Sequence, residues 1–267
     1  RIIKCNHPSL NEGNKEKLGN LLAYLLQYIN DLFSEDSVSS KEELIDAFKC
    51  FNSLVSHLHT ISQMDPVNAK NCVIEVIKEK YDDFKKNPTI IPSLDTLIFF
   101  QLVFFLFPTS DQKHPVVTPC ILFMSHILAK CNIKNSIDIS KGLFIVGIFS
   151  SYISLSKRFV PEAVNFIRGV LALFVPHDIR TSETFSDLPF KFIHKSQNFF
   201  VLNENSSGTS TVSKSLPLDF LIVGKSKDEL SSILVVTLKM YEKYFEELKN
   251  YHCQGIIFEK HFKIINL

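Results

Sequence analysis

Ser110, Asp111 and His114 lie within five residues of one another and have the side-chain types of a hydrolytic triad. A catalytic serine must stand on a sharp turn beside its base, as in the sequence G-x-S-x-G, and no such turn occurs in this chain. We therefore interpret the segment as a helix-to-helix turn in which Thr109, Ser110 or Asp111 bonds free backbone groups. The residues of this predicted structural turn are Phe107, Pro108, Thr109, Ser110, Asp111, His114, Pro115 and Pro119.

Two other patterns fail the tests of their chemistry. A phosphate-binding P-loop needs a second glycine five residues before its Gly-Lys-Ser end, but Asp219 occupies that position before Gly224-Lys225-Ser226. His57 and His59 are two residues apart on a predicted helix, so they point to different faces and do not favour a shared metal ion. We expect one of these histidines to be exposed and the other to be partly packed.

Paired carboxylates occur at Asp82-Asp83 and Glu246-Glu247, where neighbouring residues diverge around a helix and cannot work as a general acid and base. These failures predict that the chain is not an enzyme and has no catalytic residue, metal site or cofactor. The cysteines are spread without a C-x-x-C pair, which favours free buried thiols in the cytosol or nucleus over disulfides or zinc. They are Cys5, Cys50, Cys72, Cys120, Cys131 and Cys253.

The charge balance argues against a polyanion as the main partner. Lys plus Arg number 29 and Asp plus Glu number 28, and no stripe of basic residues or stacking motif is visible. We therefore expect the chain to bind protein, with any RNA contact confined to a local patch. The predicted docking surface comprises Ser156, Lys157, Arg158 and Phe159, where a basic pair and an aromatic residue adjoin a helix junction. The alternative is that this segment only caps the next helix.

Apolar residues recur at helical spacing in seven consecutive segments. They cover approximately residues 12–33, 40–58, 65–84, 92–107, 118–128, 137–155 and 159–175. Start signals accompany three of them: Ser40 with Glu43, Asp65-Pro66 and Thr118-Pro119. Gly142 and Gly147 would permit close approach of a neighbouring helix. The pattern predicts an all-α fold, specifically an α-solenoid of degenerate HEAT or armadillo-like helical hairpins with one irregular surface crossing.

The helix between Pro92 and Phe107 has only one ionisable side chain, Asp95, so we expect it to be fully buried in the middle of the helical stack. It is shorter than the ~20 apolar residues that a membrane span requires, and no other run looks long enough to cross a bilayer.

Three regions follow from these patterns. Residues 1–175 form the predicted helical-repeat core, and residues 176–225 form an extended or irregular crossing with a mobile loop. Residues 226–267 form a C-terminal helical pair on the same solenoid, beginning with a capping box of Ser226 and Glu229. Because the chain opens at Arg1 without Met, we expect it to be part of a longer protein.

Several short motifs, in order, resemble the conserved helical region of the nucleolar protein 14 family. They cover roughly residues 1–175, and the resemblance beyond Pro176 rests on element order alone. The motifs are His7-Pro-Ser-Leu10, Glu12-Gly-Asn-Lys15, Lys17-Leu18, Phe107-Pro-Thr-Ser-Asp111, His114-Pro-Val-Val-Thr-Pro119, Lys141-Gly-Leu-Phe144 and Ser154-Leu-Ser-Lys-Arg-Phe-Val-Pro-Glu162.

The resemblance implies a non-enzymatic scaffold of the small-subunit processome in the nucleolus and nucleus, needed for early pre-rRNA processing and small-subunit assembly. The partners that it implies are the nucleolar complex protein 4 homologue and the pseudouridine methyltransferase of small-subunit assembly. The pre-rRNA and small nucleolar RNA particle would be reached indirectly, and no membrane is implied. The alternative is a generic helical-repeat adaptor of nuclear transport or trafficking that shares only the architecture.

Overall fold

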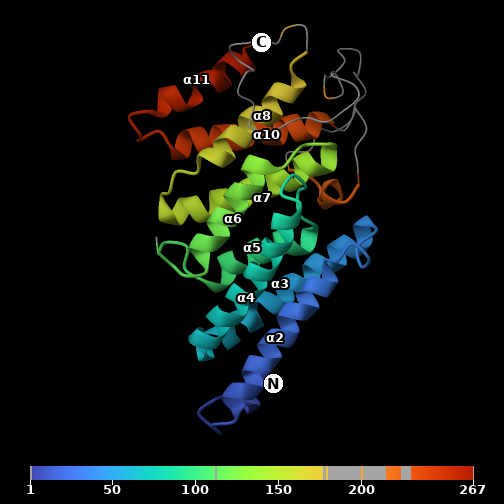
Figure 1. The fold of residues 1–267 in the computed structure, drawn as a ribbon, viewed down its shortest axis with the longest axis vertical. Coiled ribbons are helices and arrows are strands. Elements are labelled where there is room, and N and C mark those ends of the chain that lie inside the picture. The colour runs from blue at the N-terminus through green and yellow to red at the C-terminus, as the bar shows by residue number, and fades with distance from the viewer. Residues whose placement is uncertain are drawn as a thin grey trace. The chain divides into compact units, whose positions relative to one another are not determined.

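The structure is a computed structural model that describes residues 2–111, 113–176, 179, 200, 215–223 and 230–266, without the side chain of Leu155. Its described elements are helices, with no strand among them, so the predicted all-α class is confirmed (Figure 1). They are α1 (Ile2–Cys5), α2 (Asn14–Leu32), α3 (Lys41–Met64), α4 (Pro66–Lys86), α5 (Leu94–Leu106), α6 (Val117–Lys130), α7 (Ser136–Ser156), α8 (Pro161–Phe174), the 3₁₀ helix η2 (Leu218–Leu221), α10 (Leu230–Glu247) and α11 (Gln254–Ile265).

Two of the three predicted helix starts are confirmed. The Ser40 hydroxyl accepts a hydrogen bond from the Glu43 backbone N–H, and the Glu43 carboxylate accepts one from the Ser40 N–H, which is a complete capping box for α3. Asp65 caps α4 ahead of Pro66. The third prediction, with Thr118 as N-cap and Pro119 as the first helical residue, is two residues late, because α6 begins at Val117.

The first of two compact units contains Arg1–Asn87 and Pro92–Met124. Helix α5 packs against α2, α3 and α4 in this unit, as Figure 1 shows. Aromatic rings link neighbouring helices: the Phe123 ring lies 5.1 Å from the Phe100 ring and 5.0 Å from the Tyr81 ring. The unit is therefore built around one apolar helix.

The expected full burial of α5 is wrong at the helix's C-terminal end. Phe99 and Phe100 are 1% exposed, whereas Phe105 is 38% exposed and Phe104 is only partly buried. Three neighbouring helices cannot cover every direction around a fourth, so one aromatic residue of the last turn faces solvent within this unit.

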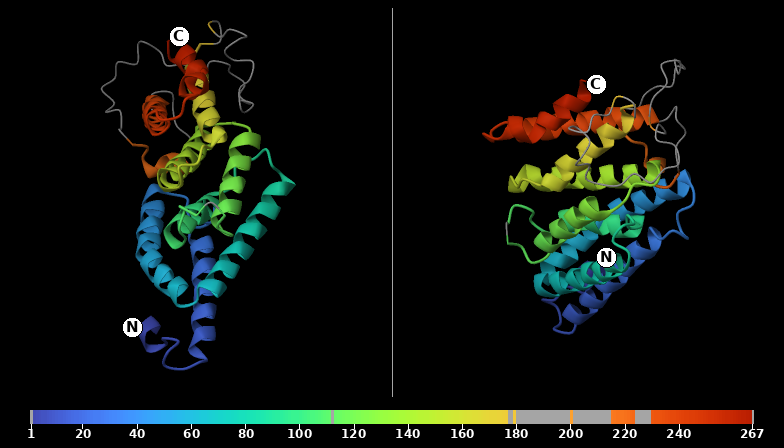
Figure 2. Two further views of the ribbon diagram at one scale, coloured as in Figure 1. Left: turned by 90° about the vertical axis from the view of Figure 1, so that its left-hand side faces the viewer. Right: turned by 45° about the horizontal axis from the view of Figure 1, so that its top comes forward.

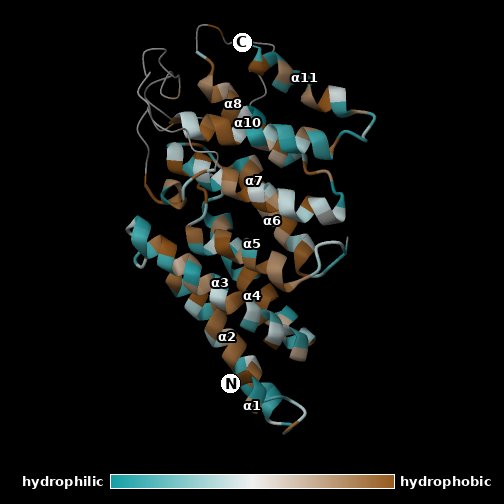
Figure 3. Cartoon of the chain, turned by 180° about the vertical axis from the view of Figure 1, so that it is seen from behind, coloured by the Kyte–Doolittle hydropathy of each residue, from teal (hydrophilic) through white to brown (hydrophobic). Residues whose placement is uncertain are grey.

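The second compact unit contains Pro88–Ile91 and Ser125–Leu267. Helix α10 packs against α7 and α8, and α11 packs against α8 (Figure 2). Figure 3 shows hydrophobic and hydrophilic residues mixed along α10, as expected of an amphipathic helix. The buried residues of α10 recur every three or four positions, namely Leu230, Ile233, Val236, Thr237, Tyr241 and Tyr244.

The close approach predicted at Gly142 is confirmed. A Cβ atom at Gly142 would lie 2.1 Å from the Phe166 ring of α8, so only hydrogen fits there. At Gly147 the nearest such contact, with Met240, would be an ordinary 3.7 Å. Gly142 therefore allows α7 and α8 to approach each other closely.

Helix α7 corrects the expectation that no run could cross a bilayer. Its segment from Ser136 to Ser154 is long and apolar enough by length and composition. However, 67% of the best window in that segment is buried inside the structure, and core helices pass the same test.

The six cysteines are free, but only Cys120 and Cys131 are buried, so the expectation of generally buried thiols is wrong. Burial raises the pKa of the Cys131 thiol to about 12. The predicted mobile loop and the Ser226–Glu229 capping box lie outside the described residues. The solenoid arrangement and the three-region division remain predictions.

Candidate partner-binding surfaces

The turn between α5 and α6 uses a histidine as its main capping residue. Nδ1 of His114 accepts hydrogen bonds from the backbone N–H groups of Val116 (3.2 Å) and Val117 (3.3 Å), at the start of α6. Asp111 accepts a hydrogen bond from the backbone N–H of Lys113 at 2.9 Å. Asp111 therefore bonds a backbone group of the turn as we expected, while His114 bonds those at the start of α6.

The protonation state of His114 fits this role. Partial burial lowers the pKa of its imidazole, with an opposing contribution from Asp111 and a further lowering from Lys70. A neutral ring keeps a lone pair on Nδ1 to accept both N–H groups. The Phe107 ring lies 5.3 Å from the imidazole, so the ring packs against the turn while it caps the helix.

A groove runs between α4 and the segment that leads from this turn into α6. Two hollows of ≈ 310 and ≈ 340 Å³ lie along α4, one lined by His114 and the other by the next residue, Pro115, and we call them together the α4 groove. One wall belongs to α4 and is formed by Val67, Lys70, Ile74, Ile77, Lys78 and Tyr81. The rest of the lining comes from α3 and from the chain between the end of α5 and α6, and includes Ser62, Gln63, Leu106, Phe107, Pro108, His114, Pro115, Val116, Pro119, Leu122 and Phe123.

Much of the groove's apolar surface is open to solvent. Leu122 is 64% exposed and Val67 is 63% exposed, while Ile74 and Tyr81 are partly buried. Exposed apolar side chains that cluster in a concave surface are typical of a binding site. Five of the eight residues of the predicted structural turn line this groove, namely Phe107, Pro108, His114, Pro115 and Pro119.

Two lysines of α4 line a different hollow from three of its four carboxylates. Lys70 and Lys78 line the α4 groove, and no carboxylate occurs among the described residues that line it. Glu75, Glu79 and Asp83 instead line a separate hollow of ≈ 450 Å³ on the side toward α2. The groove is therefore the basic side of this helix.

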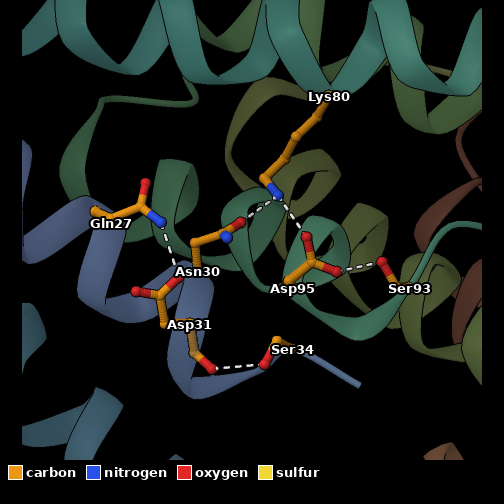
Figure 4. Close-up of polar contacts among 7 residues, drawn as sticks. All are labelled: Gln27, Asn30, Asp31, Ser34, Lys80, Ser93 and Asp95. Atoms are coloured by element: carbon orange, nitrogen blue, oxygen red, sulfur yellow. Dashed lines mark hydrogen bonds and ion pairs between the residues drawn. The ribbon is translucent and has the colours of Figure 1, made fainter. Parts of the chain in front are cut away.

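The hollow on the α2 side contains a structural polar cluster (Figure 4). Lys80 donates to the Asn30 side-chain oxygen at 2.7 Å and to Asp95 at 2.5 Å, and the Ser93 hydroxyl donates to the same carboxylate. The Lys80 ammonium also lies 4.9 Å from the centre of the Phe99 ring. This cluster gives Asp95, the single charge of α5, a partner and so belongs to the packing of the unit.

The predicted docking surface in the second unit is a helix junction. Lys157 ends α7 in the left-handed conformation with φ 50°, and its carbonyl accepts a hydrogen bond from the Tyr251 hydroxyl at 2.9 Å. The Lys157 side chain is exposed, Arg158 is partly buried and Phe159 is 40% exposed. Ser156 is buried and donates to the Tyr152 carbonyl, so it is not available to a partner.

Comparison with known proteins decides the family. The model of the Nop14-like family matches residues 1–266. This chain belongs to the Nop14-like family.

Curated relatives of this Nop14-like chain come from animals and yeasts. It is 43% identical over 176 residues to the nucleolar protein 14 homolog of Drosophila melanogaster, covering 66% of this chain and 20% of that protein. It is 38% identical over 223 residues to mouse nucleolar protein 14, covering 82% of this chain and 25% of the mouse protein. It is 35% identical over 175 residues to nucleolar complex protein 14 of Saccharomyces cerevisiae, covering 65% of this chain and 21% of the yeast protein. The chain thus spans about a fifth to a quarter of these relatives.

The other candidate residues of the Nop14-like chain lie apart from any site that the structure forms. His57 and His59 are both exposed, which corrects the expectation that one would be packed. Among the described residues no group of three or more His, Cys, Asp or Glu is placed to hold a metal ion. Position 219 is the Asp that breaks the P-loop pattern, and residues 224–226 lie outside the described part of the chain.

Sequence reasoning missed the α4 wall of the groove. Ile74 and Tyr81 belong to the same apolar periodicity as Val73, Ile77 and Phe84, but Ile74 and Tyr81 are only partly buried. One signal was available: the apolar stripe of α4 is wider than one face needs, because Ile74 and Tyr81 flank the positions that face the core. Only the structure shows that Ile74 and Tyr81 line a groove.

Proposed function

We propose that this chain is a non-enzymatic scaffold segment of the small-subunit processome, which supports early pre-rRNA processing and small-subunit assembly by docking other nucleolar factors. Membership of the Nop14-like family is the observation that carries the proposal, because its relatives are named as nucleolar proteins and not as enzymes. The nucleolus is accordingly the location of the chain, and its role lies in ribosome biogenesis.

The proposed partners are the nucleolar complex protein 4 homologue and the pseudouridine methyltransferase of small-subunit assembly. The pre-rRNA and small nucleolar RNA particle would be bound through such proteins. Support comes from the near balance of charges, 29 basic against 28 acidic residues, which provides no general attraction for RNA. The junction at Lys157, Arg158 and Phe159 supplies a basic and aromatic surface of the kind that protein interfaces use.

A pulldown of the tagged chain from nuclear extract, followed by sequencing of bound RNA and identification of bound proteins, tests this function. We expect pre-ribosomal RNA and nucleolar assembly factors to co-purify, and the RNA to be lost after washing at a salt concentration that leaves the protein partners bound. Recovery of transport cargo or vesicle proteins without pre-ribosomal RNA would instead support the adaptor of nuclear transport or trafficking.

A further inference from the structure

The α4 groove has the properties of a site for a helical segment of another protein. We propose that it binds an amphipathic helix whose apolar face is flanked by acidic residues. The inference rests on the proposed scaffold function and adds to it the place and the chemistry of one docking contact.

The shape of the groove favours a helix. Its α4 wall presents Val67, Lys70, Ile74, Lys78 and Tyr81, which recur every three or four residues and so lie on one face. From Val67 to Tyr81 the wall is about 21 Å long at 1.5 Å per residue, which matches about four turns of a bound helix. Both walls are helices or proline-bearing segments without a strand edge among the described residues, so an added β-strand has nothing to pair with.

Apolar anchors are available along the groove. Leu122 and Val67 are the most exposed of them, at 64% and 63%, and the Tyr81 and Phe123 rings, 5.0 Å apart, line the same hollow as Leu122. Burying exposed leucine, valine and proline surface under a partner's apolar side chains would provide the main driving force for binding. A bound helix would present such side chains at the spacing of the α4 wall.

Charge complementarity specifies the flanks of that helix. Lys70 and Lys78 line the groove, and neither makes an ion pair with a described residue. Three carboxylates of α4, Glu75, Glu79 and Asp83, line the hollow toward α2. The fourth, Asp82, is paired with Lys85 at 2.7 Å and interacts more weakly with Lys78. Acidic residues beside the apolar face of a partner would therefore meet two lysines, neither of which is held in an ion pair.

The same observations argue against a nucleic acid in the groove. Its lining contains two lysines and no arginine among mostly apolar side chains and prolines, whereas nucleic-acid surfaces are much more densely basic. A phosphate backbone would leave most of the exposed apolar surface without a matching partner. A protein helix with acidic flanks uses both the apolar and the basic features.

A displayed library of random 16-residue peptides, selected against the 267-residue chain, tests the proposal without knowledge of the natural partner. We expect enrichment of peptides with apolar residues at i, i+3 or i+4, and i+7, and with Asp or Glu on the flanks. The dissociation constant of a synthetic enriched peptide is then measured by fluorescence anisotropy, together with a twin in which Lys replaces each acidic residue. We expect the twin to bind at least about tenfold more weakly, as two lost charge contacts imply.

Two groove variants and two matched controls locate the binding. Leu122→Ser should weaken the acidic peptide about tenfold or more, as loss of an interface anchor does. Tyr24→Ser, which removes a side chain 75% exposed on α2, should leave its affinity unchanged. The double variant Lys70→Glu with Lys78→Glu should reverse the preference in favour of the basic twin. Lys49→Glu, on the exposed face of α3, should not.

Four outcomes would overturn the proposal: no enriched amphipathic peptide, enrichment of basic flanks, equal binding by Leu122→Ser, or displacement of the peptide by a 20-nucleotide single-stranded RNA. The nuclear pulldown separates this inference from the scaffold function. Recovery of pre-ribosomal particles with failed peptide selection rejects the groove and leaves the scaffold function standing. Successful selection with no pre-ribosomal particles would reject the scaffold function and leave the groove as a helix-binding site.

Discussion

The ammonium nitrogen of Lys80 on α4 lies 2.5 Å from a carboxylate oxygen of Asp95 in the first turn of α5. Their side chains are only 12% and 16% exposed, and Asn30 on α2 accepts a second bond from the same ammonium. Three helices of the first unit are thereby joined through one charge pair. Because little water reaches the pair, either charge left alone would be poorly solvated.

Asp95→Asn should therefore lower the free energy of unfolding by about 3 kcal/mol, the scale for removing one partner of a largely buried pair. The matched control is Asp46→Asn, which disrupts the pair with Lys49 whose side chains are 74% and 72% exposed. That change should cost less than about 1 kcal/mol. Urea unfolding followed by circular dichroism measures both, and equal losses would show that the Lys80–Asp95 pair is effectively solvated.

The two ends of α5 should respond differently to loss of a ring. Phe100 is 1% exposed and its ring makes an edge contact with Phe123, so Phe100→Ala should cost about 3–5 kcal/mol. Phe105 is 38% exposed, and Phe105→Ala should cost about 1 kcal/mol because less area returns to water. The same urea measurement applies. A larger cost at Phe105 than at Phe100 would contradict the observed packing.

Two glycines in helices provide a matched test of close packing. Gly142→Ala forces the Phe166 ring to move and should destabilise the chain by about 1–3 kcal/mol, despite the better helix propensity of alanine. Gly255→Ala, on α11, meets nothing within 4 Å and should stabilise it by up to about 1 kcal/mol. Opposite shifts in melting temperature are expected, and a gain at both positions would place α7 and α8 farther apart than the structure does.

The stability of the chain should decrease as the pH falls, because of His261 on α11. Its ring donates from Nε2 to the Val164 carbonyl at 3.0 Å, stacks on Tyr241, and is 1% exposed. Burial lowers its pKa to about 4; the bond to Val164 opposes this shift, and Arg168 adds to it.

The unfolded chain, with an ordinary histidine pKa of about 6.5, binds more protons than the folded chain between pH 6.5 and 4. The contribution of His261 to the free energy of unfolding is therefore fully present above about pH 6.5. It is lost as the pH falls to about 4, and the loss is at most about 3 kcal/mol. In His261→Gln, which keeps a donor for Val164, the free energy of unfolding should depend less steeply on pH in this window. His57→Gln, at an exposed position, should keep the steeper dependence of the unaltered chain.

The junction after α7 should affect partner binding more than folding. Reversing both charges, with Lys157→Glu and Arg158→Glu, is expected to weaken capture of nucleolar partners from nuclear extract. Because Arg158 is partly buried, the single variant Lys157→Glu is the cleaner test, and it should lower stability by no more than about 1 kcal/mol at the helix C-terminus. Lys86→Glu, also exposed at a helix end, is the control. Normal co-purification by both junction variants would remove this surface from consideration.

The sequence by itself determined the helices of this protein and most of their ends. Ser40 and Glu43, and Asp65 and Pro66, make their capping contacts with backbone groups no more than three residues away, so local sequence is sufficient to predict them. The cap made by His114 is equally local, yet it depends on a neutral ring with an available Nδ1, and partial burial by the surrounding fold favours that state.

Only the tertiary structure decided which face of each helix has a partner. The pairing of Lys80 with Asn30 and Asp95 spans 50 and 15 residues of sequence, and periodicity contains no information about the partner. Within one apolar run, Phe100 is buried and Phe105 is exposed, because the neighbouring helices cover only part of α5. The α4 groove arises in the same way, since Tyr81 and Leu122 become neighbours in one hollow only when α4 and α6 pack together.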